Sequence, residues 1–168
     1  MIEKLQQKIG LLAIGEALID LISTEPAETL EQAPVFRRFQ GGSPANLAVN
    51  VARLGGASAL VARAGDDAFG RYFKNALQAS GVETRYFTLD PARRTSLVFV
   101  ARTSGTPDFQ PYRSADYHLY PGDLPRQALE EARIVHTTTW PLSKEPARST
   151  VLQWMRQAHA AGASISFD

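Results

Sequence analysis

Short apolar runs alternate along this chain with segments in which apolar residues recur at helical spacing. The first run covers Leu11 to Ile14 and resumes from Leu18 to Ile22, which predicts a central strand that bends or breaks at Gly15. Further strands are predicted at 35–40, 59–64, 95–101, 109–112, 134–138 and 164–167, and helices at 44–54, 68–80, 124–132 and 146–161. Repeated strand and helix alternation predicts an α/β fold, in which helices cover a parallel sheet and ligands bind at the carboxyl ends of strands.

Some predicted strands do not fit this alternation. Residues 95–101 give the strongest β pattern in the chain, a turn follows at 105–108, and 109–112 is expected to return as the partner strand. Together with 35–40, this hairpin over 95–113 is expected to form a small sheet outside the main layer, which would act as a lid. The polar, proline-containing segment 24–34 is predicted to be a connecting loop.

The most informative stretch is GGSPANLAVNVARLGG, residues 41–56. Gly41 and Gly42 have no Cβ, so a ligand can approach the main chain closely there. Ser43 suits a helix N-cap and Pro44 the first helical position. The apolar spacing that follows predicts a helix buried on most sides. The residues that carry this spacing are Ala45, Leu47, Ala48, Val49, Val51, Ala52 and Leu54.

Two polar side chains on this helix share one face, because Asn46 and Asn50 are four residues apart. Asn46 lies in the first turn, beside free N–H groups and the positive end of the helix dipole, which is a favourable place for a polar ligand. The alternative is that both asparagines bind neighbouring backbone groups. The paired glycine favours the ligand, since a helix cap needs one glycine at most.

Asp20 is flanked by Ile19 and Leu21, and a carboxylate in an apolar context must find hydrogen-bond donors or stay in contact with water. Alternation along a half-exposed strand allows Asp20 to face solvent. It can equally face a pocket and accept hydrogens from the hydroxyl groups of a ligand.

Other polar residues have simpler interpretations. Asp66 or Asp67 is expected to cap the next helix, and adjacent aspartates without further ligands do not predict a metal site. The three histidines, His118, His136 and His159, lack metal-ligand spacing and are interpreted as structural or surface residues. Trp140 and Trp154 are expected to pack in the core or along a groove.

Composition narrows the possible classes of protein. The 168 residues suit one domain, and the absence of cysteine excludes a disulfide scaffold and a thiol nucleophile and fits a reducing compartment. The net charge of +1, without a basic face, predicts no nucleic-acid partner. The apolar segment 9–18 follows Lys4 and Lys8, but Glu16 and Asp20 interrupt it and it is too short to span a bilayer. We therefore expect no membrane partner and a cytoplasmic location.

Taken in order, four motifs resemble those of the ribokinase-like (PfkB-type) sugar kinases. They are Gly15-Glu16 with Asp20, GGSPAN with Asn46, the AGDDAFG turn at 64–70, and the strand pair that ends at Tyr112-Arg113. The resemblance covers essentially the whole chain. GEALIDLI at 15–22 and YRSAD at 112–116 are most similar to the fructokinase and 2-keto-3-deoxygluconate kinase branch.

This resemblance implies a ribokinase-like fold with a Rossmann-like sheet and a β lid, and it implies a substrate site. Asp20 and Asn46 would hold sugar hydroxyls, and Gly41 and Gly42 would let the sugar approach the backbone. Arg113 in the lid would contact the sugar from above. Since an arginine also suits the carboxylate of an acidic sugar, Arg113 does not decide between the two substrates.

The resemblance also implies ATP and Mg²⁺ as cofactors, whose binding residues and catalytic aspartate lie in the family's C-terminal half. The chain ends at Asp168, and its last residues, SISFD, are similar to a strand near the middle of the family fold. We therefore expect an N-terminal, sugar-binding half that lacks a catalytic base and is inactive alone. The sequence RAGD at 63–66 is similar to the family's catalytic signature but lies too early and fits the first-half turn instead.

Three alternatives remain at this stage. The first is a non-catalytic truncated module that binds sugar or forms a homodimer, through the lid or through an exposed C-terminal sheet edge. The second is a nucleoside kinase of the same superfamily. The third is a dinucleotide-binding domain, which is disfavoured because Gly15-Glu16-Ala17 offers only one glycine after the first strand.

Overall fold

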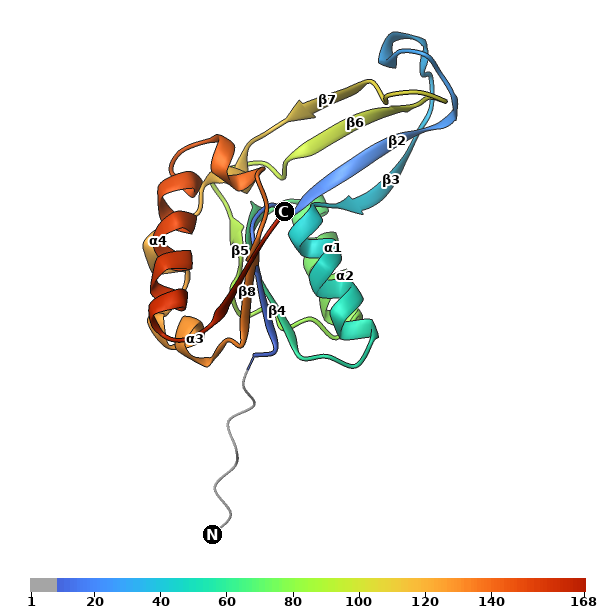
Figure 1. The fold of residues 1–168 in the computed structure, drawn as a ribbon. Coiled ribbons are helices and arrows are strands. Elements are labelled where there is room, and N and C mark those ends of the chain that lie inside the picture. The colour runs from blue at the N-terminus through green and yellow to red at the C-terminus, as the bar shows by residue number, and fades with distance from the viewer. Residues whose placement is uncertain (1–8) are drawn as a thin grey trace.

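Two separate β-sheets organise the chain in this computed structural model, which describes residues 9–168 (Figure 1). The main sheet is entirely parallel and has the strand order β5-β4-β1-β8-β9. Its strands are β1 (Leu11–Ile14), β4 (Ser58–Gly65), β5 (Phe87–Asp90), β8 (Ile134–Thr137) and β9 (Ser164–Phe167). Lys4 and Lys8, which the sequence analysis noted before the first strand, lie outside the described residues.

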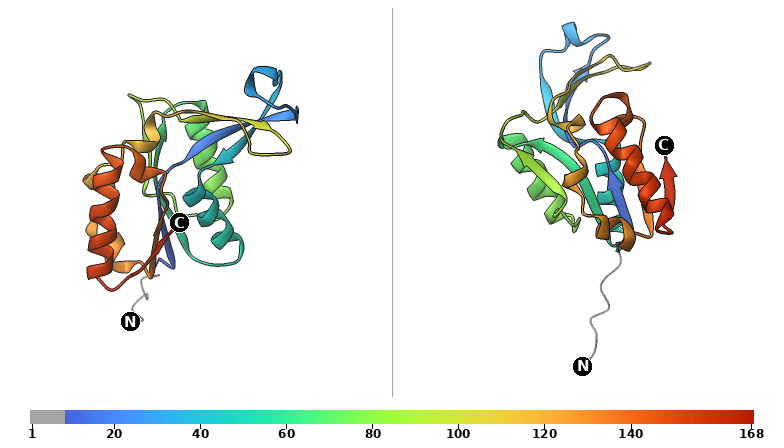
Figure 2. Two further views of the ribbon diagram at one scale, coloured as in Figure 1. Left: turned by 45° about the horizontal axis from the view of Figure 1, so that its top comes forward. Right: turned by 90° about the vertical axis from the view of Figure 1, so that its left-hand side faces the viewer.

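Helices cover both faces of the main sheet (Figures 1 and 2). One face carries α1 (Ser43–Arg53) and α2 (Ala68–Ala79), and the other carries α3 (Arg126–Glu131) and α4 (Ala147–Ala160). Strand β1 is buried on both sides because successive side chains point to opposite faces. Leu12 and Ile14 pack in the core that contains Trp154 of α4, whereas Leu11 and Ala13 pack in the core that contains Phe73 of α2.

The small sheet has the strand order β3-β2-β6-β7 and projects from the end of the main sheet where its strands finish (Figure 1). Its strands are β2 (Leu18–Pro26), β3 (Phe36–Gly41), β6 (Leu97–Arg102) and β7 (Phe109–Tyr112). β2 pairs antiparallel with β3 and parallel with β6, and β6 pairs antiparallel with β7. The hairpin predicted over 95–113 is present, and the short helical turn η1 (Leu30–Gln32) lies in the connection between β2 and β3.

The strand breaks at Gly15, which is one of the two outcomes that the sequence predicted, but the two halves do not form one central strand because the chain changes sheets there. β1 ends in the main sheet, and β2 begins three residues after Gly15 as an inner strand of the small sheet. An added Cβ on Gly15 would lie 2.7 Å from Cγ of Pro44 and 3.4 Å from Cγ of Pro141, so only glycine fits between these two prolines. The change of sheet at Gly15 therefore depends on its contacts with Pro44 and Pro141, which are distant in the sequence and cannot be read from the local pattern.

The sequence pattern also failed to predict β5, which is only four residues long and forms the edge of the main sheet beside β4. Only Phe87 and Asp90 of this strand are buried. Such a short strand gives almost no periodic signal, and its pairing with a distant strand decides its conformation. The remaining predicted strands and helices occur within a few residues of their expected bounds.

Helix α1 corrects two further expectations. Its N-cap is Gly42 and not Ser43, which is the first helical residue. The helix is not buried on most sides: Pro44, Ala45 and Ala48 are its buried residues, and Leu54, just after its end, is 89% exposed. A helix in an outer layer buries one stripe against the sheet, so its other apolar residues remain partly in contact with solvent.

Among residues 9–168, the helices are all too short or too polar to cross a lipid bilayer.

Candidate functional site

The carboxylate of Asp20 lies at the base of the small sheet, against the end of the neighbouring strand. In β2, Asp20 stands opposite Phe39 of β3 on one side and Val98 of β6 on the other. A Cβ built on Gly41 would lie 2.5 Å from the carboxyl carbon of Asp20, so the glycine makes room for this carboxylate. Burial raises the pKa of Asp20 above its ordinary value. Within the described part of the chain, no hydrogen bond or ion pair engages its oxygens, which leaves them available to a ligand.

Gly42 brings the chain from β3 into α1 with a backbone conformation that side chains disfavour, at φ 102°. A Cβ at this position would collide with the carbonyl oxygen of Glu16. The Glu16 side chain then accepts a hydrogen bond from the backbone N–H of Ser43 at 2.9 Å. Its second oxygen accepts a longer hydrogen bond, 3.4 Å, from the hydroxyl of Thr138. Glu16 thus fixes the start of α1 relative to the ends of β1 and β8.

Glu16 is the buried acid of this region, with a relative exposure of 4%. Desolvation is the largest influence on it and raises the pKa of Glu16 to about 7, while its hydrogen bond from Ser43 acts in the opposite direction. From the sequence, Glu16 was noted as part of a motif and as a charge that interrupts the apolar segment 9–18, without a role at the site. A glutamate between Gly15 and Ala17, in an otherwise apolar run, was the signal that pointed to it.

Asn46 lies in the first turn of α1, where its own N–H donates to the carbonyl of Gly42 at 2.9 Å. The side chains of Asn46 and Asn50 are both exposed, and they line a groove between β3 and α1. Phe39 and Gln40 of β3 form the opposite wall of this groove. Phe73 and Leu77 of α2 also line this groove, whereas Asp20 does not. Asn46 is connected to the Asp20 region through the backbone, by way of Gly42 and the end of β3.

Arg113 follows β7 at the other edge of the small sheet and is held firmly. Its Nε and Nη2 lie 2.8 Å and 2.7 Å from Oδ2 of Asp116. Nη1 donates to the hydroxyl of Ser143 at 2.5 Å, and the guanidinium lies over the Trp140 ring, 4.6 Å from its centroid. Asp116 is completely buried and also accepts hydrogen bonds from the Ser96 hydroxyl at 2.6 Å and from Nε1 of Trp140 at 3.1 Å.

Strand register relates these groups to one another. Ile19 pairs with Gln40 on one side and with Leu97 on the other, and Leu97 pairs with Tyr112. Gly41 follows Gln40 in β3, and Arg113 follows Tyr112 at the end of β7. The two residues therefore stand at opposite edges of the small sheet, at its base. Since strands are about 4.8 Å apart, Arg113 lies about 10 Å from the β2 strand that carries Asp20.

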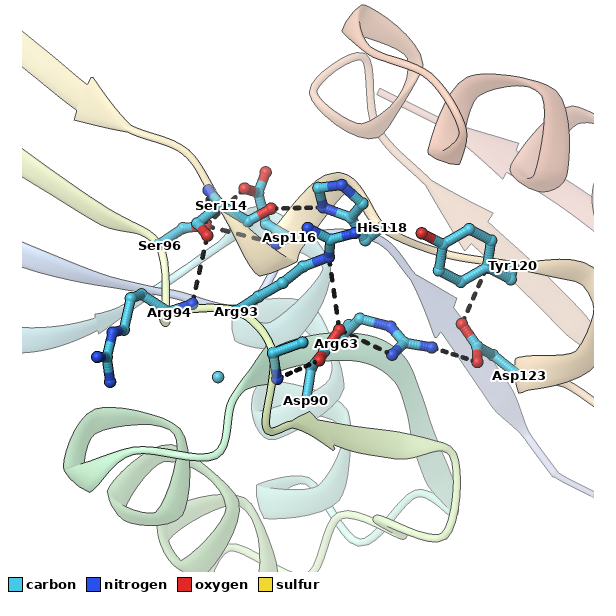
Figure 3. A network of polar contacts seen from close by, with 12 residues as sticks. Arg63, Asp90, Arg93, Arg94, Ser96, Ser114, Asp116, His118, Tyr120 and Asp123 are labelled. Carbon is cyan, nitrogen blue, oxygen red and sulfur yellow. Dashed lines mark hydrogen bonds and ion pairs between the residues drawn. The ribbon is translucent and has the colours of Figure 1, made fainter.

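A second polar network lies beside this site and ties the ends of β4 and β5 to the chain that follows the small sheet (Figure 3). Arg63 pairs with Asp90 at 3.1 Å and with Asp123 at 2.5 Å, and all three side chains are at least 86% buried. The Tyr120 ring covers the Arg63 guanidinium at 5.2 Å. These contacts hold the ends of the two strands against the chain that follows the small sheet, which is a structural role, although Nε of Arg63 is buried without a hydrogen-bond partner among the described residues.

The aspartates of the AGDDAFG turn also have structural roles. Asp67 is the N-cap of α2 and accepts hydrogen bonds from the N–H groups of Phe69 and Gly70. It also accepts both hydrogen bonds that Thr95 donates, which ties the turn to the start of β6. Asp66 is half-exposed and pairs with Arg71. Of the two caps that the sequence allowed, the structure selects Asp67.

Residues 9–168 hold no group of three or more histidine, aspartate or glutamate side chains placed to bind a metal ion. The described residues therefore do not form a Mg²⁺ site from protein side chains alone. Both tryptophans have the packing roles that the sequence predicted. Trp154 is buried in the core, and Trp140 packs against Arg113.

Comparison with known proteins identifies the family of this chain. The family model described as pfkB family carbohydrate kinase matches residues 8–168. Probable fructokinase-7 of Arabidopsis thaliana is 40% identical over 160 residues, which cover 94% of this chain and 47% of that protein. A fructokinase of Solanum tuberosum is 40% identical over 161 residues, which cover 94% of this chain and 50% of that protein. The chain belongs to the pfkB family of carbohydrate kinases.

Solved structures give the same fold. The fructokinase of Halothermothrix orenii superposes with a TM-score of 0.90 at 38% identity, covering 95% of this chain and 56% of that chain. An uncharacterized sugar kinase from Pyrococcus horikoshii, solved in complex with ATP, superposes with a TM-score of 0.89 at 36% identity, covering 94% and 52%. The fold is thus the α/β, ribokinase-like fold of these kinases. The chain spans about half the length of the curated relatives that it matches.

Proposed function

We propose that this chain is the sugar-binding part of a kinase that transfers the γ-phosphate of ATP to a hydroxyl of a fructose-like sugar. The observation that carries the proposal is the Asp20 carboxylate, seated against Gly41 with its oxygens unengaged among the described residues. A carboxylate of this kind accepts hydrogen bonds from neighbouring hydroxyls of a polyol. A site built to pair with hydroxyls also discriminates strongly against analogues that lack them.

The remaining predicted residues support the same site. Gly41 makes room for the Asp20 carboxylate, and Gly42 turns the chain from β3 into α1. The helix N-terminus adds a positive end that would hold sugar oxygens. Asn46 in the first helical turn supplies both a donor and an acceptor. Arg113, at the far edge of the small sheet, would contact the sugar from above, so that the small sheet acts as a lid.

Phosphoryl transfer needs groups that position the donor and neutralise the charge on the phosphate oxygens. We propose that the residues which bind ATP and deprotonate the sugar hydroxyl belong to the half of the relatives' length that this chain does not span. On this proposal, the 168-residue chain binds sugar and has little or no kinase activity alone. The cytoplasmic location expected from the sequence also stays a prediction.

Binding of D-fructose to the purified chain, measured by titration calorimetry, tests the site. Asp20→Asn is expected to weaken fructose binding by about tenfold or more, because it removes a charged acceptor of hydrogen bonds. Asp66→Asn is the matched control, since Asp66 is half-exposed on a turn and pairs only with Arg71. Equal affinity of the Asp20→Asn variant and the wild type for fructose would contradict the proposed site.

Two further measurements separate the alternatives. A coupled assay with ATP and fructose tests inactivity, and steady turnover by the 168-residue chain would overturn the proposal that catalytic groups lie outside it. Titration with a nucleoside such as adenosine tests the nucleoside kinase alternative, for which the fructokinase relatives offer no support. The proposal expects fructose to bind and adenosine not to bind.

We also propose that the chain forms a homodimer. Exposed apolar side chains on the small sheet, at Phe109 and Tyr112, and on the outer strand β9, at Ile165 and Phe167, support this proposal. Sedimentation velocity tests it, and Phe109→Ser and Phe167→Ser distinguish the two surfaces. A monomer at all accessible concentrations would contradict the proposal.

A further inference from the structure

Arg113, the cation of the proposed sugar site, carries its own counter-ion within the protein. Both Nε and Nη2 of Arg113 point to one carboxylate oxygen of Asp116, at 2.8 Å and 2.7 Å. Asp116 has no exposed surface, and the Arg113 side chain is 8% exposed. Ion pairs in such a poorly solvated place are screened much less than pairs on the surface. The positive charge of Arg113 is therefore neutralised in place.

Most hydrogen-bond donors of the guanidinium are also occupied. The edge formed by Nε and Nη2 faces Asp116, and Nη1 donates to the hydroxyl of Ser143 at 2.5 Å. Nη2 makes a further, longer contact with the carbonyl oxygen of Trp140 at 3.4 Å. Arginine recognises a ligand carboxylate most strongly through two parallel N–H donors on one edge. Asp116 takes the place that such a ligand would need.

Asp116 is itself held in position, so it cannot easily give way to a ligand. Its carboxylate accepts hydrogen bonds from the Ser96 hydroxyl at 2.6 Å and from Nε1 of Trp140 at 3.1 Å, in addition to those from Arg113. Ser96 also accepts from the N–H of Ser114 at 2.8 Å, and Figure 3 shows Ser96, Ser114 and Asp116 meeting at the base of the small sheet. Displacing Asp116 from Arg113 would leave a buried carboxylate without its cation, which is costly.

The other charged groups near this site are acidic or exposed. Glu16 interacts electrostatically with both Asp116 and Arg113. Asp20 lies on β2, which is two strands away from β7 in the small sheet. Lys144 lies over the Tyr117 ring at 5.0 Å, but it is exposed, so solvent screens its charge. Among the described residues, a negatively charged sugar would therefore meet the unpaired Asp20 carboxylate and no unpaired buried cation near this site.

We propose that Asp116 is a specificity-determining residue, which holds and neutralises Arg113 so that the site selects neutral sugars, such as a ketohexose, against sugar acids. The inference rests on the proposed function, because it assigns the substrate class of the same site. Asp116 acts through Arg113 and does not touch the sugar, which makes it a positioning residue. Selection of this kind works by leaving the wrong ligand with an unpaired charge.

The experiment compares the dissociation constants of D-fructose and 2-keto-3-deoxy-D-gluconate for the 168-residue chain by titration calorimetry. The wild type is expected to bind fructose at least about tenfold more tightly than the acid, which corresponds to one unmet charged hydrogen bond. In Asp116→Asn, which keeps the shape but frees the charge of Arg113, this preference is expected to fall by about tenfold or more. The double variant Arg113→Gln with Asp116→Asn removes the freed cation and is expected to bind the acid poorly again.

Asp123→Asn is the matched control, since it also removes a buried carboxylate that pairs with an arginine, Arg63. It is expected to leave the ratio of the two dissociation constants unchanged. Circular dichroism establishes that each variant is folded, and the wild-type comparison needs no variant, so a failure of Asp116→Asn to fold does not remove the test.

Two results would overturn the inference, and they have different consequences for the proposed function. If the wild type binds neither sugar, the proposed function fails and the inference fails with it. If the wild type binds fructose but binds the acid equally well or better, or if Asp116→Asn binds fructose with an unchanged preference, the inference alone is overturned.

Discussion

The α-carbon of Gly41 lies so close to the Asp20 side chain that an added Cβ would stand 2.5 Å from the Asp20 carboxyl carbon. These two residues are 21 positions apart in the chain, and the antiparallel pairing of β2 with β3 brings them together. Glycine is required at this position because any side chain would push the carboxylate away. The contact therefore couples the geometry of the backbone at the start of α1 to the position of the candidate ligand acceptor.

Gly41→Ala tests this coupling. The new methyl group is expected to displace Asp20 and to weaken D-fructose binding by about tenfold or more, with a loss in the free energy of unfolding of about 1 to 3 kcal/mol from overpacking. Titration calorimetry and urea unfolding measure the two effects. Gly105→Ala is the control, since a Cβ on Gly105 would meet no atom within 4 Å. Unchanged fructose affinity in Gly41→Ala would show that the Asp20 position does not govern binding.

The buried carboxyl of Glu16 predicts a pH dependence of stability. Because burial raises its folded-state pKa from 4.5 to about 7, the folded state holds this proton more tightly than the unfolded state between these values. The free energy of unfolding should therefore fall as the pH rises from about 4.5 to 7, by about 3 kcal/mol at most from this group.

Glu16→Gln removes this titration and keeps an acceptor for the N–H of Ser43. We expect the difference in unfolding free energy between the variant and the wild type to grow in favour of the variant as the pH rises from 5 to 8. Comparing the two proteins cancels the contribution of His136, whose pKa is lowered by burial and whose effect has the opposite sign. Urea unfolding at several pH values measures the difference. A constant difference across this range would mean that Glu16 is ionised throughout.

The two adjacent aspartates of the α2 turn should differ sharply in their contribution to stability. Asp67 accepts four hydrogen bonds, two from the first turn of α2 and two from Thr95. Asp67→Ala is expected to lower the free energy of unfolding by about 2 kcal/mol. Asp66→Ala removes only a half-exposed ion pair and should cost less than about 0.5 kcal/mol. Similar losses for both variants would contradict the assignment of Asp67 as the cap.

Arg63 should be more important for stability than an arginine in an exposed pair. Removing it by Arg63→Ala leaves Asp90 and Asp123 buried without their cation, which is expected to cost about 3 kcal/mol of unfolding free energy. Arg126→Ala breaks an exposed helical pair with Glu130 and should cost at most about 0.5 kcal/mol. Chemical denaturation of both variants gives the comparison. A loss below 1 kcal/mol for Arg63→Ala would show that solvent reaches the network.

Much of the fold could be predicted from the chain because its signals are local. The apolar run at 11–14 and the helical spacing at 147–160 each show their structure within a few residues, and so does the turn at 105–108. The paired glycine and the following SPAN likewise marked the start of α1, although the cap proved to be Gly42. The short edge strand β5 lacked such a signal because only its pairing with β4 makes it a strand.

The candidate site was predictable in its residue types but not in its contacts. Asp20, Asn46 and Arg113 could be selected from their places in the pattern and from the family resemblance, and their roles in binding sugar remain proposals. The pairing of Arg113 with a buried Asp116 could not be inferred, because the local pattern is equally compatible with a guanidinium that faces an open cavity. Burial of Asp116 depends on Ser96 and Trp140, which lie 20 and 24 residues away.

The sequence by itself therefore determined the α/β class, most element positions and the family, and it selected Asp20, Asn46 and Arg113 as candidates. Only the tertiary structure decided that the chain changes sheets at Gly15, that Gly41 makes room for Asp20, and that Arg113 is already neutralised. The physical reason is the separation along the chain between the residues that interact. Helical spacing and turns follow from neighbours along the chain, whereas close packing and buried charge pairs depend on residues that only the completed fold brings together.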